Sequence, residues 1–314
     1  MKALLISLTI TILLSACNAI TDPAPEDPLV PASVMQLVEK SFDNPENVVF
    51  TEILENKIWN VELESRAKKY NSVLSPNSIK VSYRLTGTDV PDSLRNLLNT
   101  SVIKGGTLSG FKQEEYISFS DFSYEKTYLA DYIWKGKPYV LKWGATFRGG
   151  PKMVYDLEMS PFKSRFPTAD LDDMPELLKQ YFQKKGFQFL RATVFMDTDF
   201  RKTYQVWLHK TNADFQLLFD QDCNLIAGSD QSVRVDDVRE LPENIRSYIS
   251  SANANKDYGF EAEITGMSRS ELDGVKSYVL ILHQPKLPDN TDTWYILLDQ
   301  NAKPLLSYYS CTRY

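Results

Sequence analysis

The chain repeats one pattern of apolar positions four times. In each copy a proline is followed by apolar or aromatic side chains three, six and seven positions later. The four copies begin at Pro31, Pro91, Pro175 and Pro242. Spacings of three and four residues place these side chains on one face of an α-helix. Proline is well tolerated at the first helical position, where no backbone N–H is needed. The pattern therefore predicts four amphipathic helices, each beginning at its proline.

A second pattern follows each predicted helix and begins at a lysine. The four lysines are Lys57, Lys126, Lys202 and Lys276. In the first copy Trp59, Val61 and Leu63 alternate with Asn60, Glu62 and Glu64. A period of two is typical of a half-buried β-strand. Further strand-like runs occupy residues 79–85, 139–143, 215–219 and 294–298. The repeated unit is therefore predicted to be one helix followed by several antiparallel strands.

The spacing between proline and lysine groups the repeats in pairs. It is 26 and 27 positions in the first and third copies, and 35 and 34 in the second and fourth. Duplication of a two-repeat module explains this pairing most simply. It predicts two modules, at residues 31–160 and 172–314. Residues 161–171 between them contain two prolines and lead into the polar Asp172 and Asp173, as a linker would.

The segment from Leu218 to Ile226 reads Leu-Phe-Asp-Gln-Asp-Cys-Asn-Leu-Ile. Together with the helix-then-strands order, it resembles the PepSY-like, beta-lactamase-inhibitor-like domains of Bacteroides-type secreted proteins. Their last hairpin reads roughly Phe-Asp-x-Asp-Gly-x-Leu-Ile. This chain departs from that motif, because Cys223 replaces the turn glycine and the fourth repeat has Asp-Gln-Asn-Ala at 299–302. The resemblance implies an α+β fold with helices packed on one face of an antiparallel sheet. It also implies a protein-binding or inhibitory role, without catalysis.

The N-terminus carries an export signal. Residues 1–16 contain one lysine and an unbroken run of apolar or hydroxylated residues from Ala3 to Leu14, as signal peptides do. The sequence Leu-Ser-Ala-Cys at 14–17 resembles the lipobox of bacterial lipoproteins, which implies that Cys17 becomes an acylated N-terminus bearing palmitate-type chains. The alternative is an ordinary secretory signal with a chance cysteine. Residues 17–30 contain three prolines and three acidic residues, and are expected to form an extended tether. Asn18, rather than aspartate, favours the outer membrane or cell surface.

Composition restricts the class of protein. Of the 314 residues 43% are hydrophobic and 24% charged, as in globular domains. Without the signal, 34 basic residues face 41 acidic ones. This balance argues against nucleic acid as a partner. No apolar run after the signal reaches the ~18–20 residues of a membrane helix, so the lipid anchor is the expected membrane contact.

Catalytic and metal-binding motifs are scarce. The chain has two histidines, His209 and His283, each seven positions after its repeat's lysine. They cannot supply an HExxH motif or a four-ligand zinc set. They either approach each other or lie on an exposed sheet face. The run 220–224 has oxygen side chains at alternate positions, but it lacks the glycine and glutamate of a calcium loop, so a β-turn is favoured. We expect no cofactor, no metal site and no enzymatic activity.

The chain has three cysteines, and two of them lie in the second module. Cys223 and Cys311 each fall near the end of a repeat. Outside the cytoplasm a disulfide between them would persist. The alternative is a pair of buried free thiols.

One surface stands out as a candidate partner site. If the second, fourth and sixth residues after each lysine face the helices, the third, fifth and seventh face away. In the second module the latter set is unusually apolar and includes Trp207, His209, Val279, Ile281 and His283. Exposed apolar patches with aromatic residues often mark partner sites. The alternative is that another sheet or the first module covers this face.

These observations favour a surface- or periplasm-facing lipoprotein that acts as a non-catalytic protein-binding module, such as an inhibitor or regulator of a secreted hydrolase. An alternative is a glycan-binding or structural accessory lipoprotein, in which Trp134, Trp143 and Trp207 would stack on sugars. A third is a hydrolase with an unrecognised site. The sequence identifies no particular protein partner.

Replacing Cys17 tests the lipoprotein assignment. The Cys17→Ser variant has no thiol to acylate, so it should lose its chains and leave the membrane fraction. Membrane fractionation and mass spectrometry of the N-terminus measure both effects. Continued membrane retention of Cys17→Ser would exclude Cys17 as the anchor.

Overall fold

The structure is a computed structural model that describes residues 30–87, 90–118, 126–147, 153–229, 232–259, 263–283 and 290–313. Cys17, the signal and all but the last residue of the predicted tether lie outside these ranges. Among the residues described, no helix is both long and apolar enough to cross a membrane.

Within the described ranges, each predicted repeat forms one helix followed by four antiparallel strands. The first contains α1 (Ala32–Ser41), β1 (Glu46–Leu54), β2 (Ile58–Ser65), β3 (Lys68–Leu74) and β4 (Ile79–Gly87). The second contains α2 (Asp92–Thr100), β5 (Thr107–Ile117), β6 (Lys126–Trp134), β7 (Lys137–Phe147) and β8 (Met153–Ser160). The third contains α3 (Glu176–Lys185), β10 (Gln188–Met196), β11 (Lys202–Lys210), β12 (Ala213–Phe219) and β13 (Leu225–Ser229). The fourth contains α4 (Glu243–Asn255), β15 (Glu263–Leu272), β16 (Val275–His283), β17 (Asn290–Asp299) and β18 (Pro304–Arg313).

Shorter elements precede the third and fourth helices. They are β9 (Ser164–Thr168) and the 3₁₀ helix η1 (Leu171–Asp173), then β14 (Val233–Arg234) and the 3₁₀ helix η2 (Val238–Glu240).

The sequence pattern predicted each proline as the first residue of its helix, but each proline instead lies one position before the helix begins. Each helix begins at the residue after its proline, and Pro31, Pro91 and Pro175 are the N-caps of α1, α2 and α3. Pro31 has a ψ of 141°, which is extended rather than helical. Its carbonyl oxygen nevertheless accepts a hydrogen bond from the N–H of Val34 at 2.9 Å. The ring fixes φ near the helical value, so proline can also occupy the cap position.

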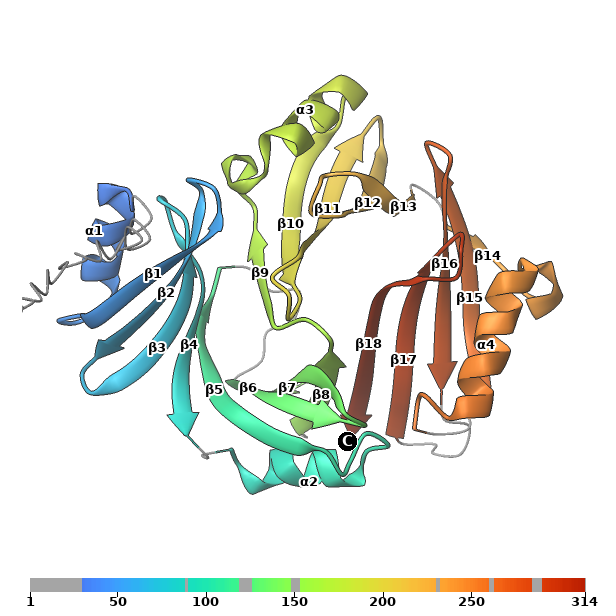
Figure 1. Ribbon diagram of the computed structural model, residues 1–314, viewed down its shortest axis with the longest axis horizontal. Coiled ribbons are helices and arrows are strands. Elements are labelled where there is room, and N and C mark those ends of the chain that lie inside the picture. The colour runs from blue at the N-terminus through green and yellow to red at the C-terminus, as the bar shows by residue number, and fades with distance from the viewer. Residues whose placement is uncertain are drawn as a thin grey trace, which may run out of the picture.

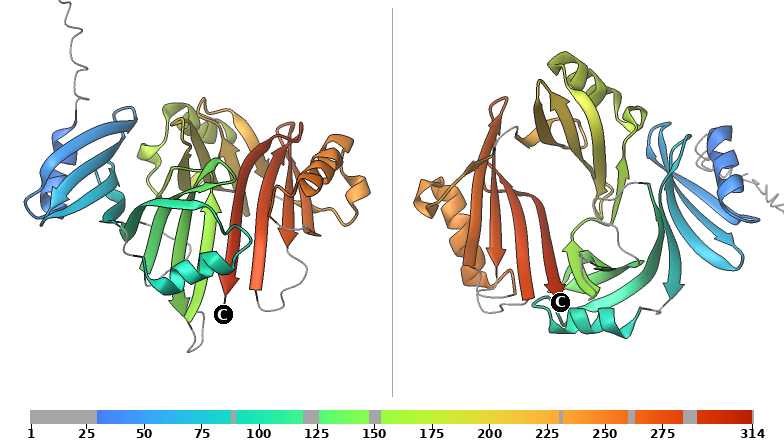
Figure 2. Two further views of the ribbon diagram at one scale, coloured as in Figure 1. Left: turned by 60° about the horizontal axis from the view of Figure 1, so that its bottom comes forward. Right: turned by 180° about the vertical axis from the view of Figure 1, so that it is seen from behind.

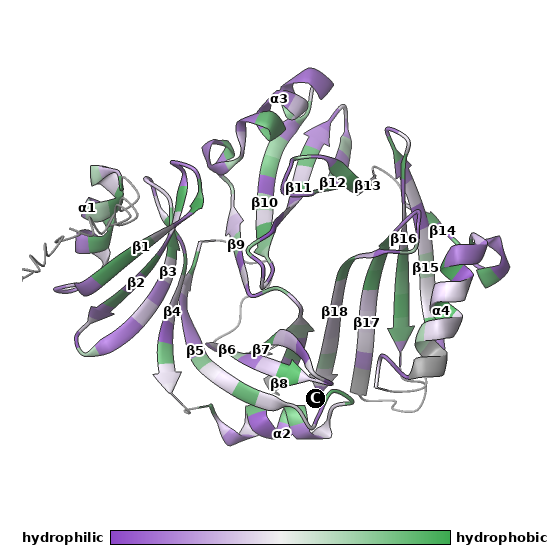
Figure 3. Ribbon diagram, viewed as in Figure 1, coloured by the Kyte–Doolittle hydropathy of each residue, from purple (hydrophilic) through white to green (hydrophobic). Residues whose placement is uncertain are grey.

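The predicted helix and strand faces are confirmed as core. The residues three and seven positions after each proline are all buried: Val34, Val38, Leu94, Leu98, Leu178, Phe182, Ile245 and Ile249. Of the residues six positions after each proline, Leu97 is buried, whereas Leu37, Tyr181 and Tyr248 are half-buried. The second, fourth and sixth residues after each lysine are buried as well, from Trp59 in β2 to Leu282 in β16. Figure 3 shows the resulting alternation of apolar and polar residues along the strands.

The strands form two antiparallel sheets, which confirms the predicted α+β class. The large sheet has thirteen described strands in the order β1-β2-β3-β4-β5-β6-β7-β8-β18-β17-β16-β15-β14. The small sheet has five described strands in the order β13-β12-β11-β10-β9. The first, second and fourth repeats therefore share one sheet, and the third forms its own. In Figure 1 the large sheet curves around the small one, with α2 and α4 on the outside of the curve.

The large sheet crosses the predicted boundary between the modules. Strand β18 pairs with β8, with Cys311 opposite Leu157. Residues 161–171, predicted as a linker, contain β9, which pairs with β10. The strand tolerates Pro167 because β9 is an edge strand, where a missing N–H breaks no interior ladder. This segment is therefore part of the small sheet.

Three hydrophobic clusters hold the helices and sheets together. Helices α2 and α4 pack in one cluster with residues of β6 to β8 and β16 to β18. Helix α1 packs on its own repeat. Helix α3 packs on the small sheet in a cluster that also includes Val73, Val81 and Tyr83 from the first repeat. The small sheet is thus docked on the first repeat (Figure 2).

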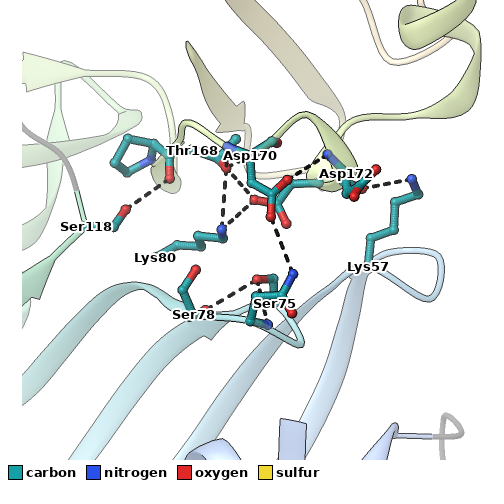
Figure 4. A network of polar contacts seen from close by, with 11 residues as sticks. Lys57, Ser75, Ser78, Lys80, Ser118, Thr168, Asp170 and Asp172 are labelled. Carbon is teal, nitrogen blue, oxygen red and sulfur yellow. Dashed lines mark hydrogen bonds and ion pairs between the residues drawn. The ribbon is translucent and has the colours of Figure 1, made fainter. Parts of the chain in front are cut away.

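A buried polar network secures this docking (Figure 4). Lys80 Nζ of β4 lies 2.5 Å from Asp173 Oδ2 of η1, and their side chains are only 3% and 4% exposed. Thr168 donates a hydrogen bond to the same carboxylate. Lys57 Nζ donates to the carbonyl oxygens of Asp172 and Met174, each at 2.9 Å. Two lysines of the first repeat therefore hold the chain that leads into α3.

Removal of the Lys80 charge should destabilise the protein strongly. Lys80→Met leaves the buried Asp173 carboxylate unpaired, which typically costs about 3–5 kcal/mol in the free energy of unfolding. Urea denaturation measures this loss. Lys69→Met is the control, because its 3.5 Å pair with Glu64 is largely exposed and contributes under ~1 kcal/mol. Similar losses in the two variants would show that the buried pair is not an important tie.

Candidate functional site

The most prominent hollow lies between the inner face of the large sheet and the small sheet. Two adjoining cavities, of about 450 and 260 Å³, share the lining residues Gln205, Tyr295, Leu306 and Tyr308. They form one inter-sheet groove. The larger cavity by itself falls within the size range of small-molecule sites, roughly 300–1,000 Å³.

Strand alternation explains which side chains line the groove. On β17, Trp294, Ile296 and Leu298 are buried in the cluster that contains α2 and α4. The intervening Tyr295 and Leu297 point the other way and line the groove. The same alternation on the neighbouring strands places Ser277, Val279, Tyr308, Ser310 and Thr312 on its wall.

A pair of tyrosines lies where the two cavities meet. Tyr295 and Tyr308 are directly opposite each other on β17 and β18. Their rings are stacked, with centroids 4.7 Å apart and planes 17° apart. Burial, and then proximity to Tyr295, raise the pKa of Tyr308, so its hydroxyl stays protonated at neutral pH. Across the larger cavity, the rings of Phe162 and Phe195 also lie 4.7 Å apart.

An ionic cluster lines one end of the groove. Arg165 Nη1 and Nη2 reach the two carboxylate oxygens of Glu158 at 2.6 and 3.3 Å. Burial by itself would raise the pKa of Glu158, but Arg165 and Lys142 outweigh it and hold that pKa below its usual value. Burial lowers the pKa of Lys142. Asp156 accepts a hydrogen bond from Thr312 at 2.7 Å. Two basic and two acidic side chains therefore balance in this end of the groove.

Hydroxyl and amide side chains line the other end. Gln205, Gln216 and Ser229 come from the small sheet, and Ser270 and Ser277 from the large sheet. The hydroxyls of Ser270 and Ser277 are 2.8 Å apart and hydrogen-bonded. Ser229 Oγ is buried without a hydrogen-bond partner in the protein. Such an atom usually costs about 1–3 kcal/mol unless something satisfies it.

The predicted partner surface is divided between the two sheets. Val279 lines the groove, while Ile281 packs near Gly266 of the neighbouring strand. Arg191 lies 4.4 Å above the Trp207 ring and covers one of its faces. His209 Nδ1 lies 2.7 Å from Asp214.

The residues of β11 and β16 that point away from the helices therefore do not form one continuous outward patch. Gln205 and Val279 instead face the same cavity from opposite sheets. His283 belongs to the large sheet and His209 to the small one. In the part of the chain that the structure describes, no three His, Cys, Asp or Glu side chains are grouped as metal ligands.

The disulfide predicted as one alternative is wrong, because Cys223 and Cys311 are both free thiols. Cys311 is fully buried in the core under the large sheet, and burial raises the pKa of its thiol to about 12. Cys223 packs against a different cluster, in the small sheet. The two-sheet arrangement places them in separate cores.

Cys223 occupies the predicted β-turn. Asp220 Oδ1 accepts hydrogen bonds from the backbone N–H groups of Asp222 and Asn224 at 3.0 and 2.8 Å. Cys223 and the corresponding Ala302 of the fourth repeat both have a φ of +64°, the left-handed region that glycine adopts most easily. The turn thus keeps its conformation without the glycine of the PepSY-like motif that it resembles.

Two of the tryptophans suggested for sugar stacking cannot serve that role. Trp134 is 5% exposed and Trp143 is fully buried. Both lie in the core formed with α2 and α4, because their strand positions face the helices.

Comparison with known proteins adds no relative: no family model, no curated protein and no solved structure matches the chain. The PepSY-like resemblance therefore stays a prediction from the sequence motifs.

The sequence patterns did not single out five residues of the groove: Tyr295, Tyr308, Lys142, Glu158 and Arg165. The two tyrosines could have been predicted, because the alternation along residues 294–298 places Tyr295 on the face opposite the core and Tyr308 lies beside it on the next strand. The ionic cluster could not, because it depends on β9 joining the small sheet and meeting β8 at the groove.

The Glu158–Arg165 pair should make stability depend on pH. The pKa of Glu158 in the folded state is lowered, so its contribution is present above the ordinary value near 4.5 and is lost as the pH falls through the folded-state pKa. Glu158→Gln should lower the free energy of unfolding at pH 7 by about 1–2 kcal/mol, since both side chains stay roughly one-third exposed.

Urea denaturation between pH 3 and pH 8 tests this dependence. The difference in free energy of unfolding between the wild type and Glu158→Gln should decrease below pH 4.5. Glu64→Gln, at an exposed surface pair, is the control. A gap that is equally large at pH 3 would assign the effect to packing rather than to charge.

Proposed function

We propose that this protein is a lipid-anchored, non-catalytic binding protein of the bacterial envelope, and that it takes up a slender polar ligand in the inter-sheet groove. The observation that carries this proposal is that hydroxyl, amide and aromatic side chains from two different sheets converge on one groove. Sites with a few placed polar groups among apolar ones are typical of ligand recognition.

The N-terminal sequence supports the envelope location. A lipobox-like segment ending at Cys17 and a proline-bearing tether precede the first helix. Such a tether would hold the folded part away from the membrane, within reach of soluble or surface-bound ligands.

The shape of the groove favours a narrow ligand over a broad docking surface. A standard protein–protein interface buries about 800 Å² on each partner, whereas the groove lies between two sheets of one chain. A loop, a peptide segment or a saccharide chain can enter such a space more readily than the flank of a folded domain.

A second candidate keeps the protein partner predicted from the sequence, as an inhibitor or regulator of a secreted hydrolase. The observation that favours it is the half-buried Val279 on the groove wall, with Ile281 next along the same strand face. A loop of a partner protein inserted into the groove would bury these side chains.

The repeat order supports a finer architectural proposal. The chain would have arisen by duplication of a two-repeat, PepSY-like module whose helices lie on one face of its sheet. In support, equivalent fourth strands, β8 and β18, join the second and fourth repeats. The third repeat would have separated from that sheet after the duplication.

Filling the groove should abolish binding. We use the mature chain with Cys17→Ser and measure its unfolding temperature in fractions of envelope and medium from the native organism. A ligand at 100 times its Kd stabilises the folded state by about 2.7 kcal/mol, which raises Tm by a few degrees. Gln205→Trp, which places an indole in the groove, should remove this shift.

Gln188→Trp is the matched control, because Gln188 is exposed on the small sheet and outside the groove lining. A shift that persists in Gln205→Trp would place binding elsewhere, and the absence of any stabilising fraction would contradict a binding function. Protease sensitivity of the active fraction, with loss of the shift in Trp207→Ala/Ile281→Asp, would identify the second candidate.

A further inference from the structure

The geometry points to neutral saccharides as the ligands of the inter-sheet groove. This inference rests on the proposed function and specifies the chemical class of its ligand. It is carried by three features of the groove: balanced charge, a stacked tyrosine pair and two walls of side-chain hydroxyls and amides.

The balanced charge favours a ligand without net charge. Arg165 is engaged in a two-point contact with Glu158. Asp156 is engaged with Thr312, and Lys142 is the second base against these two acids. An anionic ligand that took Arg165, or a cationic ligand that took Glu158, would leave the other member of this pair with an unpaired charge in a partly buried site, which is costly. A neutral ligand leaves the cluster intact.

The outer faces of the stacked tyrosine pair supply a flat apolar platform, because each ring covers the inner face of the other. Tyr295 and Tyr308 are partly exposed and line both cavities. The C–H face of a pyranose ring is apolar and flat, so it can lie against an aromatic ring while its hydroxyls point sideways. Aromatic side chains with a polar tip combine both kinds of contact. The raised pKa of Tyr308 keeps its hydroxyl available as a donor as well as an acceptor.

The hydrogen-bonding groups of the groove come mainly from side chains. Gln205, Gln216, Ser277 and Ser310 carry donors and acceptors at fixed strand positions, which matches the dense hydroxyls of a sugar. Ser229 Oγ is buried without a partner and belongs to this wall. Rotation of this side chain toward the groove would let a sugar hydroxyl satisfy it.

A peptide strand is less well matched to this site. An added strand binds through a row of unpaired backbone groups at a sheet edge, but the groove is walled mostly by sheet faces. Among the described strands that line it, β9 and β13 are edge strands, and β9 contacts β4 of the other sheet. β13 already contacts β15 and β16 of the other sheet.

A glycan array tests the inference. The mature Cys17→Ser chain is applied to immobilised neutral and charged oligosaccharides, and the best neutral oligosaccharide is then titrated by calorimetry. We expect neutral glycans to be retained and Tyr308→Ala to weaken the Kd at least tenfold. Tyr116→Ala is the control, since Tyr116 is 47% exposed on β5 and is not part of the groove lining.

Ser229→Ala gives a second test that does not disturb the platform. It removes only the unpartnered hydroxyl, so it should weaken binding several-fold without lowering Tm. Tyr308→Phe, which keeps the ring, should retain more affinity than Tyr308→Ala. If Tyr308→Phe binds more tightly than Tyr308→Ala, the loss of affinity in Tyr308→Ala is due to loss of ring stacking rather than to unfolding.

Retention of charged glycans alone, or of no neutral glycan, would overturn the inference. If an envelope fraction still stabilises the wild type but not Gln205→Trp, the groove-binding proposal stands and only the ligand class falls. If no fraction stabilises the wild type either, both fall.

Discussion

The pairing of β8 with β18 is the constraint on which the rest of the structure depends. These strands are about 150 residues apart in the chain, and their contact places Leu157 opposite Cys311. It joins the second and fourth repeats into one sheet, so that α2 and α4 share a single core. The face opposite that core then becomes one continuous wall. Without this pairing the groove would lose its largest side.

The small sheet provides the opposite wall, and its place is fixed by the first repeat. Lys80 and Asp173 form a buried ion pair between β4 and the segment before α3. Loss of either partner would leave an uncompensated buried charge, which is strongly destabilising. In this protein the ion pair sets where the third repeat docks, and Val81 and Tyr83 then pack against the small sheet. The groove is the space between these two walls, one held by the β8–β18 pairing and the other by the contact with the first repeat.

This construction separates stability from recognition. The side chains that face the helices are large, apolar and fully buried, as Trp59 and Trp143 show. The side chains that line the groove are more mixed, and they include the hydroxyls, amides and tyrosines that are left to contact a ligand. Because successive residues of a strand point to opposite faces, each groove residue is held by buried neighbours in its own strand. A rigid scaffold of this kind keeps the entropic cost of binding small.

The sequence by itself determined the local structure. The spacing of apolar residues after Pro31 or Pro175 specifies a helix face, and the alternation from Lys57 or Lys202 specifies a strand face, because both depend only on backbone periodicity. The turn at Asp220 could also be predicted from the sequence, since its hydrogen bonds join residues at most four positions apart. Tertiary structure alone decided which strands pair, that the segment containing β9 joins a sheet, and that Gln205 faces Val279 across a cavity. Those outcomes depend on contacts between residues far apart in the chain, which no local spacing records.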